Sequence, residues 1–337
     1  MRSIAFVLGT TLIGCVGGGG DGPAWSGGPA GKVYVYSGPL YELSASDGSL
    51  IRELHPSSSI AQNLQADASH AYMTMADGGG DGHTYQLGAA SDDFTMLTPT
   101  SFNPIGVSGR ELIGQDNEAK VVRVDLDSGA TTMFDFPYVP GTGALACQQG
   151  SLYQRTLYLA CMRISATGTD AGMLTYDLDA ATFGPFVLVK SGVQPLVLAS
   201  NVNGTPSGAV FALYEGQAQA GTRTMYKITG GTVSPGVALP GTADDLDEQA
   251  AIDDTVFVAM NPDNAIIPFD AATMTAGTPF TVERPRHIRA GGGQLWSSSR
   301  GHSGTLVKID PATREQIDRG FSDIDSNEIN ALAFGGD

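Results

Sequence analysis

Charged residues are scarce in this sequence, and basic ones are scarcest. Only 18 Lys and Arg accompany 35 Asp and Glu among 337 residues, a formal net charge of −17. Proteins that bind a nucleic-acid backbone present a basic stripe, so this balance argues against such a partner. A basic protein, a cation or solubility alone fits better. The hydrophobic content of 42% excludes intrinsic disorder, and the sequence is not collagen-like.

Hydrophobic runs long enough to span a membrane are also missing. The apolar run from Ile4 to Ile13 is too short for a spanning helix and, after Met1 and Arg2, predicts a signal peptide. It ends in Leu12-Ile13-Gly14-Cys15, which resembles the bacterial lipobox. The resemblance implies cleavage before Cys15, a diacylglyceryl group on its thiol and an acylated new amino terminus. An ordinary secretory signal with an incidental Cys15 is the alternative.

Two or three acyl chains, palmitate among them, would anchor the protein stably in a membrane. We therefore expect a lipoprotein signal peptide at 1–14, a lipidated Cys15 with a flexible glycine-rich leash at 15–31, and one globular domain at 32–337. Val16 follows the lipidation site and is not an inner-membrane retention signal, which favours the outer membrane. Whether the domain faces the periplasm or the cell surface stays open. Loss of Arg2 would leave a mature charge of 17 minus 35, or −18.

Cysteine is nearly absent, and apart from Cys15 only Cys147 and Cys161 occur. Export places them in an oxidising compartment, where we expect them to form a disulfide. A bridge closing a loop of about 15 residues contributes about 3 kcal/mol in the chain-entropy model. Two buried thiols on neighbouring strands are the alternative, and two lone cysteines are a poor metal site.

Period-two alternation of apolar and polar residues dominates from Lys32 onward, as in Thr255–Met260, and no amphipathic helix is evident. The chain is therefore predicted to be all-β. One hairpin recurs seven times: a strand ends on an apolar residue, a turn follows, and another strand begins. The residue after that apolar position is Ser44, Gly88, Asp125, Asp177, Thr229, Asp270 and Asp310. Their mean spacing is near 44 residues, the length of a four-stranded propeller blade.

Seven copies predict a single seven-bladed β-propeller with strands A to D in each blade. Lys32–Tyr36 would supply strand B of blade one, and nothing ordered precedes it. The spare strand within 328–335 would then fill the innermost place of blade one and close the ring. Cys147 and Cys161 would lie on strands A and B of blade four. The recurring Asp residues are expected to cap turns by accepting backbone N–H groups.

The segments Phe269-Asp270-Ala271-Ala272-Thr273 and Ile309-Asp310-Pro311-Ala312-Thr313 resemble the repeats of YVTN and PQQ-like propellers. The resemblance covers about 32–336 and implies a propeller fold. Blade ends lack the Trp-Asp dipeptide of WD40 repeats. Trp25 lies in the leash and Trp296 is alone, so the tryptophan-docking pattern of quinoproteins is missing and binding of pyrroloquinoline quinone is not implied.

Catalytic motifs are missing too: no nucleophile elbow, zinc-protease helix, phosphate loop or dinucleotide fingerprint occurs, and the five histidines are scattered. Three acidic loops should share the face formed by B–C and D–A connections. Their carboxylates are Asp77 and Asp81; Asp244, Asp245, Asp247 and Glu248; and Asp323, Asp325 and Glu328. Dense oxygen ligands suit Ca²⁺, although no loop completes an EF-hand. Solvated turns are the alternative.

One basic cluster stands out against the acidic background: Arg284, Arg286, His287 and Arg289, with Arg300 and His302 nearby. Arginine binds carboxylate or phosphate through a two-pronged fork, so the cluster would form an anion or partner site near the channel mouth. Internal pairing with the acidic loops is the alternative.

Two functions are consistent with these features. The first is a non-enzymatic, monomeric envelope scaffold that binds a protein or glycan partner through its loop face, with no cofactor predicted beyond Ca²⁺. The second is a propeller enzyme of the lactonase or dehydrogenase kind with a metal or cofactor in the channel. The second needs convergent carboxylates, for which Asp247, Glu248 and Glu328 are the candidates.

Overall fold

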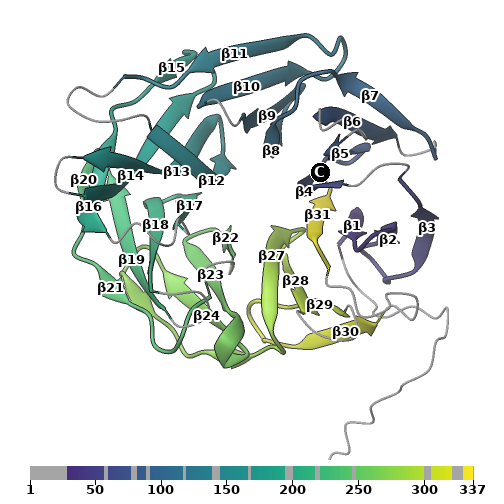
Figure 1. Ribbon diagram of the computed structural model, residues 1–337. Coiled ribbons are helices and arrows are strands. Elements are labelled where there is room, and N and C mark those ends of the chain that lie inside the picture. Colours follow the sequence, from purple (N-terminus) through teal and green to yellow (C-terminus); the bar gives the residue numbers. More distant parts are fainter. Residues whose placement is uncertain are drawn as a thin grey trace, which may run out of the picture.

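The chain folds into a ring of seven antiparallel sheets around a central channel, which confirms the seven-bladed propeller (Figure 1). The computed structural model describes residues 29–56, 60–76, 82–88, 92–116, 119–138, 145–165, 168–193, 200–216, 221–244, 248–299, 305–320 and 329–336. The predicted signal peptide, Cys15 and most of the leash lie outside these ranges. Within them, no helix is long and apolar enough to cross a membrane.

Each blade runs from an innermost strand at the channel to an outermost strand at the rim. Blade two contains β4 (Ile60–Ala66), β5 (His70–Ala76), β6 (Gly82–Gly88) and β7 (Phe94–Thr98). Blade three contains β8 (Asn103–Ser108), β9 (Glu111–Gln115), β10 (Lys120–Asp125) and β11 (Thr131–Asp135). Blade seven contains β27 (Pro285–Gly291), β28 (Gln294–Ser299), β29 (Thr305–Ile309) and β30 (Gln316–Gly320).

Blades four to six differ because the outer strand is split into two short pieces that pair with the same third strand. Blade four has β12 (Leu145–Tyr153), β13 (Thr156–Ser165), β14 (Gly168–Asp177), β15 (Thr182–Phe183) and β16 (Val187–Val193). Blade five has β17 (Ser200–Thr205), β18 (Gly208–Glu215), β19 (Thr222–Thr229), β20 (Thr232–Val233) and β21 (Val237–Ala238). Blade six has β22 (Gln249–Ile252), β23 (Thr255–Met260), a 3₁₀ turn (Asn261–Asp263), β24 (Ala265–Asp270), β25 (Thr275–Ala276) and β26 (Phe280–Thr281).

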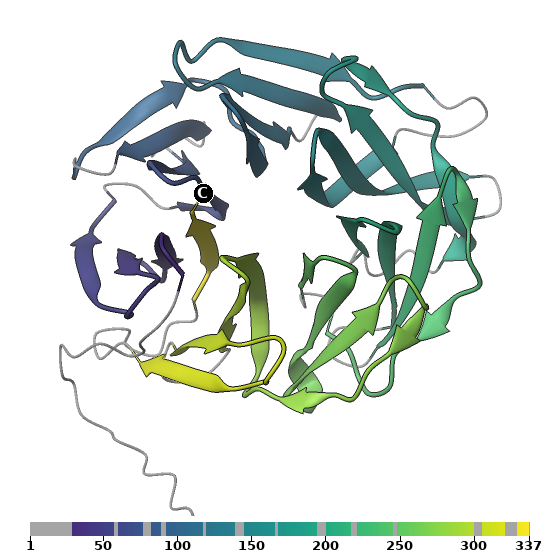
Figure 2. The same cartoon turned by 180° about the vertical axis from the view of Figure 1, so that it is seen from behind.

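Blade one joins the two ends of the chain. Its inner strand is β31 (Ala331–Gly335), followed outward by β1 (Lys32–Tyr36), β2 (Leu40–Ser44) and β3 (Leu50–Leu54). β31 pairs antiparallel with β1 over five residues, from Lys32 opposite Gly335 to Tyr36 opposite Ala331. The predicted closure is therefore confirmed, and Figure 2 shows β31 beside β1 from behind.

The core lies between neighbouring blades and follows from the two-residue period of the strands. On β1, Val33 and Val35 are fully buried in a cluster with Trp296 of blade seven. The intervening Tyr34 is fully buried on the other face, in a cluster with Met73 of blade two. Each strand interior therefore packs on both sides, which explains its nearly continuous apolar sequence.

Aspartate-capped turns join the third strand to the fourth in blades three, four, six and seven, as predicted. Asp125, Asp177, Asp270 and Asp310 accept backbone N–H groups three residues on, at 2.8, 2.8, 2.9 and 2.8 Å. The residue after each capped turn has positive φ: Gly129 at 70°, Ala181 at 52°, Met274 at 57° and Arg314 at 63°. These hydrogen bonds favour the ionised form and lower the pKa of Asp310, the backbone N–H of Thr313 contributing most.

Cys147 and Cys161 form the predicted disulfide, and they stand directly opposite each other on β12 and β13. Cys161 is fully buried, while Cys147 lines the channel. The bridge therefore ties the inner wall of blade four to the next strand.

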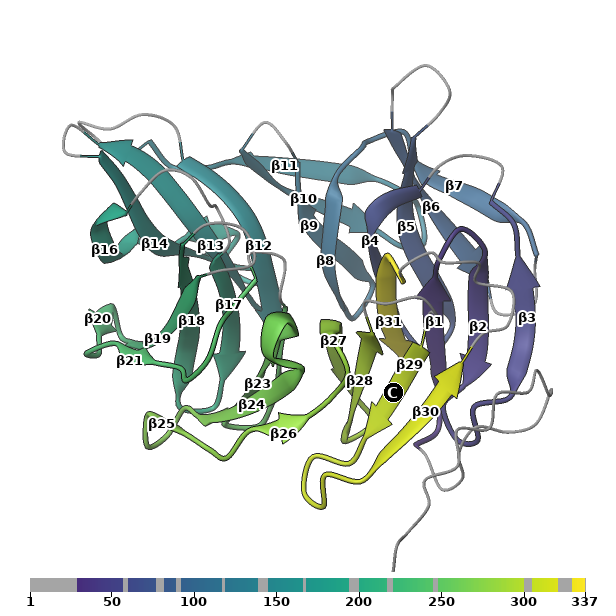
Figure 3. The same cartoon turned by 60° about the horizontal axis from the view of Figure 1, so that its bottom comes forward.

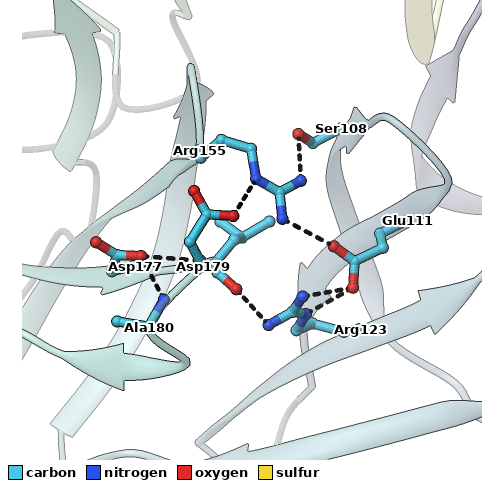
Figure 4. A network of polar contacts seen from close by, with 8 residues as sticks. Ser108, Glu111, Arg123, Arg155, Asp177, Asp179 and Ala180 are labelled. Carbon is cyan, nitrogen blue, oxygen red and sulfur yellow. Dashed lines mark hydrogen bonds and ion pairs between the residues drawn. The ribbon is translucent and has the colours of Figure 1, made fainter.

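Polar contacts join blades on the face that carries the A–B and C–D turns. Arg155, at the turn after β12, donates to Asp179 Oδ1 of its own blade at 2.8 Å and to Ser108 Oγ of blade three at 3.1 Å (Figure 4). Arg123 of β10 binds Glu111 and reaches across to the carbonyl oxygen of Leu178 at 2.8 Å. These arginines link blades three and four, where the apolar faces end.

Gly291 at the end of β27 allows the closing strand to pack. A Cβ placed on this residue would overlap the ring of Phe334 on β31, which stacks on Trp296 at 6.0 Å between ring centroids. Gly291→Ala is expected to lower the free energy of unfolding by about 2 kcal/mol, because Phe334 must shift from its packed position. Urea unfolding followed by tryptophan fluorescence measures this loss.

Gly88→Ala is the matched control, since an added Cβ at the end of β6 lies 3.8 Å from His70, an ordinary contact. A loss of similar size in both variants would contradict the role assigned to Gly291.

Candidate binding site in the central channel

Six of the seven innermost strands, together with Asn330 just before β31, line a central cavity of about 1040 Å³. All of them begin at the face that carries the D–A and B–C connections, because every blade starts at the channel and alternates direction outward. Figure 3 shows β8, β12, β17, β27 and β31 as the inner strands, with β3, β7 and β11 at the rim. The start of the inner strands therefore forms one mouth of the channel.

Side-chain amides are the characteristic lining of this cavity. Six blades each contribute at least one: Asn330 beside β31, Asn63 and Gln65 from β4, Asn103 and Gln115 from blade three, Gln149 and Gln154 from blade four, Asn201 and Asn203 from β17, and Gln249 from β22. Blade seven instead contributes Arg286, His287 and Arg289 of β27. The channel is thus a ring of neutral donors and acceptors with one cationic blade.

Irregular pairing of the inner strands affects which residues face the channel. Register shifts occur next to Leu64 on β4, Gly106 on β8, Gln149 on β12 and Ile288 on β27. A bulge breaks the strict alternation of side chains and re-aims the residues beside it. Strand periodicity alone therefore does not predict the lining.

Some amides also join neighbouring blades. Gln115 donates from Nε2 to the carbonyl oxygen of Cys147 at 2.9 Å, which links blades three and four. Gln65 donates in the same way to Pro104 at 3.4 Å, which links blades two and three. Glutamine side chains therefore both line the channel and hydrogen-bond neighbouring blades to each other.

Glu248 anchors the cationic blade. Its side chain is 16% exposed, accepts a hydrogen bond from Arg289 and lies 3.0 Å from His287 Nδ1. Its backbone N–H donates to the carbonyl oxygen of Arg286 at 3.2 Å, so blades six and seven are joined. Burial alone would raise the pKa of Glu248, but the positive charges and hydrogen bonds of Arg289 and His287 outweigh it and hold that pKa well below its usual range.

The predicted basic cluster is therefore divided. Arg289 and His287 are internally paired with Glu248, whereas Arg286 lines the channel and Arg284 is exposed just before β27. The backbone N–H of Arg284 donates to Asn264 Oδ1 at 3.0 Å. Partner binding by these residues stays a prediction. Arg300 and His302 lie outside the described residues.

Besides Glu248, the structure describes only Asp244 among the acidic-loop carboxylates, and Asp244 is 1% exposed and accepts a hydrogen bond from Asn261 at 3.3 Å. Asp77, Asp81, Asp245, Asp247, Asp323 and Asp325 lie outside the described residues, as does Glu328. Within the described ranges, no three His, Cys, Asp or Glu side chains gather as a metal site would require. Calcium binding by the acidic loops stays a prediction.

The Asn and Gln side chains that line the channel, called the amide ring below, are the feature that sequence reasoning missed. A signal was present, since Asn103, Gln249 and Asn330 occupy or directly precede the first position of an inner strand. Asn201 occupies the second position of its own inner strand. Comparing these starts across the repeats would have shown the recurrence.

No protein-family model and no curated protein sequence matches this chain. Among solved structures, it resembles dihydro-heme d1 dehydrogenase NirN in complex with DHE, with TM-score 0.57, 10% identity, and coverage of 93% of this chain and 77% of NirN. Hydrazine synthase of Kuenenia stuttgartiensis gives TM-score 0.57 at 9% identity, with 94% and 99% coverage. Apo AztD of Citrobacter koseri gives a TM-score of 0.56 at 9% identity, and the match covers 91% of this chain and 98% of AztD. At such identity these likenesses show the propeller fold alone, and the YVTN or PQQ-like repeat type stays a prediction.

Acid should weaken the contact between blades six and seven. Because the folded-state pKa of Glu248 is depressed, its stabilising effect is complete above the unfolded-state value near 4.5 and is lost as pH falls through that value toward the lower folded one. Glu248→Gln is expected to lower the free energy of unfolding at pH 6 by about 3 kcal/mol, since the partly buried Arg289 and His287 lose their partner. The variant should also flatten the decline between pH 5 and pH 3, measured by urea unfolding.

Glu315→Gln, at an exposed turn of blade seven, serves as the control and should follow the original protein throughout. Parallel acid curves for the original protein and Glu248→Gln would contradict the role of this ion pair.

Proposed function

We propose that this chain is an exported, lipid-anchored envelope protein whose propeller is a non-enzymatic binding scaffold. It takes a protein or glycan partner at the mouth where the inner strands begin. The observation that carries this proposal is the polar lining of the channel, with amides from six blades and the cationic strand β27 from the seventh. Concave sites with convergent polar groups are the usual ligand sites of rigid folds.

The mouth is suited to binding because it combines a rigid wall with connections that can vary. Interblade hydrogen bonds from Gln65 and Gln115 hold the lining in place, so little ordering is lost on binding. Arg284 is exposed on the connection leading into β27, and Arg286 lies in the lining. An acidic or polar partner could therefore contact both arginines without breaking the Glu248 ion pairs.

The enzyme alternative depends on carboxylates that converge in the channel. Glu248 accepts hydrogen bonds from Arg289 and His287, and its depressed pKa makes it a weak general base. Asp247 and Glu328, the other candidates, lie outside the described residues. The geometry at Glu248 favours a structural role for this residue, and it supports binding over catalysis as the function of the channel.

Partner capture tests the scaffold. Combined Arg284→Ala and Arg286→Ala should weaken capture of a stoichiometric partner from detergent-solubilised envelope about tenfold, because interface arginines often contribute 1 kcal/mol or more. Arg289 is left unchanged, since its removal would leave Glu248 without a main partner. Quantitative mass spectrometry of the captured material provides the measurement.

Arg110→Ala is the matched control, since Arg110 is exposed at the A–B turn of blade three on the opposite face. Equal capture by all three proteins would refute a partner site at this mouth, and tightly bound cofactor in place of any partner would favour the enzyme.

Lipid anchoring is tested at Cys15. Cys15→Ser should abolish incorporation of an alkyne-labelled palmitate and move the protein from the membrane fraction to the soluble fraction, because the acylated thiol is lost. A Cys147→Ser, Cys161→Ser variant should retain the label. Retained label in Cys15→Ser would exclude lipidation at that residue.

A further inference from the structure

Gln249 is a buried amide without a hydrogen-bond partner in the described part of the chain. It is the first residue of β22, lines the channel and is 8% exposed. Neither Oε1 nor Nε2 has a hydrogen-bond partner within the described part of the chain. Leaving such a group unpaired is costly, and unsatisfied buried polar groups in native proteins call for an explanation. A ligand in the channel supplies one.

Three further buried oxygens in the lining share this property: Asn103 Oδ1, Gln115 Oε1 and Asn203 Oδ1 have no partner among the described residues. The orientation of Gln115 follows from chemistry, because its Nε2 donates to the carbonyl oxygen of Cys147 and leaves Oε1 as the acceptor. With Gln249, these amides present four acceptors and one donor that need partners, and the buried Nε of Arg286 is a further donor in the lining. The matching ligand must donate several hydrogen bonds.

Charge narrows the ligand class further. Glu248 is neutralised by Arg289 and His287, and the other charged residues of the described lining, Asp116 and Arg286, have opposite signs. A carboxylate or phosphate group has no hydrogen to give to the amide oxygens, and a cation meets no excess negative charge. An uncharged ligand rich in hydroxyl groups fits the lining.

The positions of the acceptors distinguish a sugar from a peptide. Asn103 and Gln115 belong to blade three, Asn203 to blade five and Gln249 to blade six, so the acceptors approach the channel from different sides. An extended peptide directs its N–H groups to two opposite edges. The hydroxyl groups around a sugar ring point outward in several directions, and each can both donate and accept.

We propose that the channel binds an uncharged carbohydrate, whose hydroxyl groups donate to the amide oxygens of Asn103, Asn203 and Gln249. This inference rests on the proposed binding function and specifies its ligand class. It makes the amide ring a recognition surface, with Phe136 as the aromatic side chain in the described lining.

The test uses the purified full chain on an array of neutral and acidic glycans, followed by calorimetry with maltotriose, cellotriose and chitotriose. Trigalacturonate and a neutral Ser-Gly peptide are the comparison probes. We expect saturable binding of neutral glycans and none of trigalacturonate. Binding only to acidic glycans or to the peptide, or no binding to any probe, would overturn the proposal.

Gln249→Met separates recognition from structure. Replacing an unsatisfied amide with an apolar side chain of similar size should raise the urea midpoint of the ligand-free protein and weaken glycan binding about tenfold or more. Gln294→Met, at the first residue of β28 outside the channel, should leave the affinity unchanged. A lower midpoint or unchanged glycan affinity in Gln249→Met would assign Gln249 a structural role and refute the inference.

The two proposals fail in different ways. If a protein partner is captured through Arg284 and Arg286 while no neutral glycan binds, the scaffold stands and the carbohydrate inference is wrong. If neither a partner nor a glycan binds, both are wrong.

Discussion

Pairing of β31 with β1 is the contact on which the rest of the structure depends. It joins the last described strand of the chain to the first, so blade one exists only when both ends are in place. Without it, β1 would be an open sheet edge beside the channel, and the clusters that Trp296 and Tyr34 form on either side of blade one would lose their inner wall. Closure converts seven separate sheets into one rigid ring.

Rigidity of the ring allows its centre to be polar. The apolar side chains are buried between blades, and the hydrogen bonds of Arg155, Arg123 and Glu248 join blades where the apolar faces end. The channel wall can therefore carry many polar side chains beside its apolar ones. Amides such as Gln249 can remain without partners among the described residues at some cost in stability, a pattern typical of binding sites.

The repeat was accessible to sequence reasoning because the third strand of each blade ends in a short turn, which an aspartate caps in four blades. These turns are capped through contacts between residues three apart, by Asp125, Asp177, Asp270 and Asp310. Contacts so close in the chain can be recognised from the sequence. The spacing of these turns predicted the blade number, and the unmatched terminal strands predicted closure. The disulfide was predicted from the expected export to an oxidising compartment and from the positions of Cys147 and Cys161 on neighbouring strands.

The candidate site was much less predictable. The acidic loops and the basic cluster attracted attention because charge is rare in this sequence, yet Arg289 and His287 are engaged by Glu248, and Asp244 is buried. The channel amides attracted no attention in the sequence, since single Asn and Gln residues are common in β-proteins. Their significance arises only when strands about 40 residues apart converge.

The sequence by itself determined the fold class, the number of blades, the place of closure and the disulfide, because these depend on strand period, turn chemistry and counting. Tertiary structure alone decided which side chains line the channel. Register shifts on β4, β8, β12 and β27 redirect side chains locally, and the ring brings Asn103, Asn203 and Gln249 from three blades to one cavity. Such convergence is a property of three-dimensional closure, which no local pattern encodes.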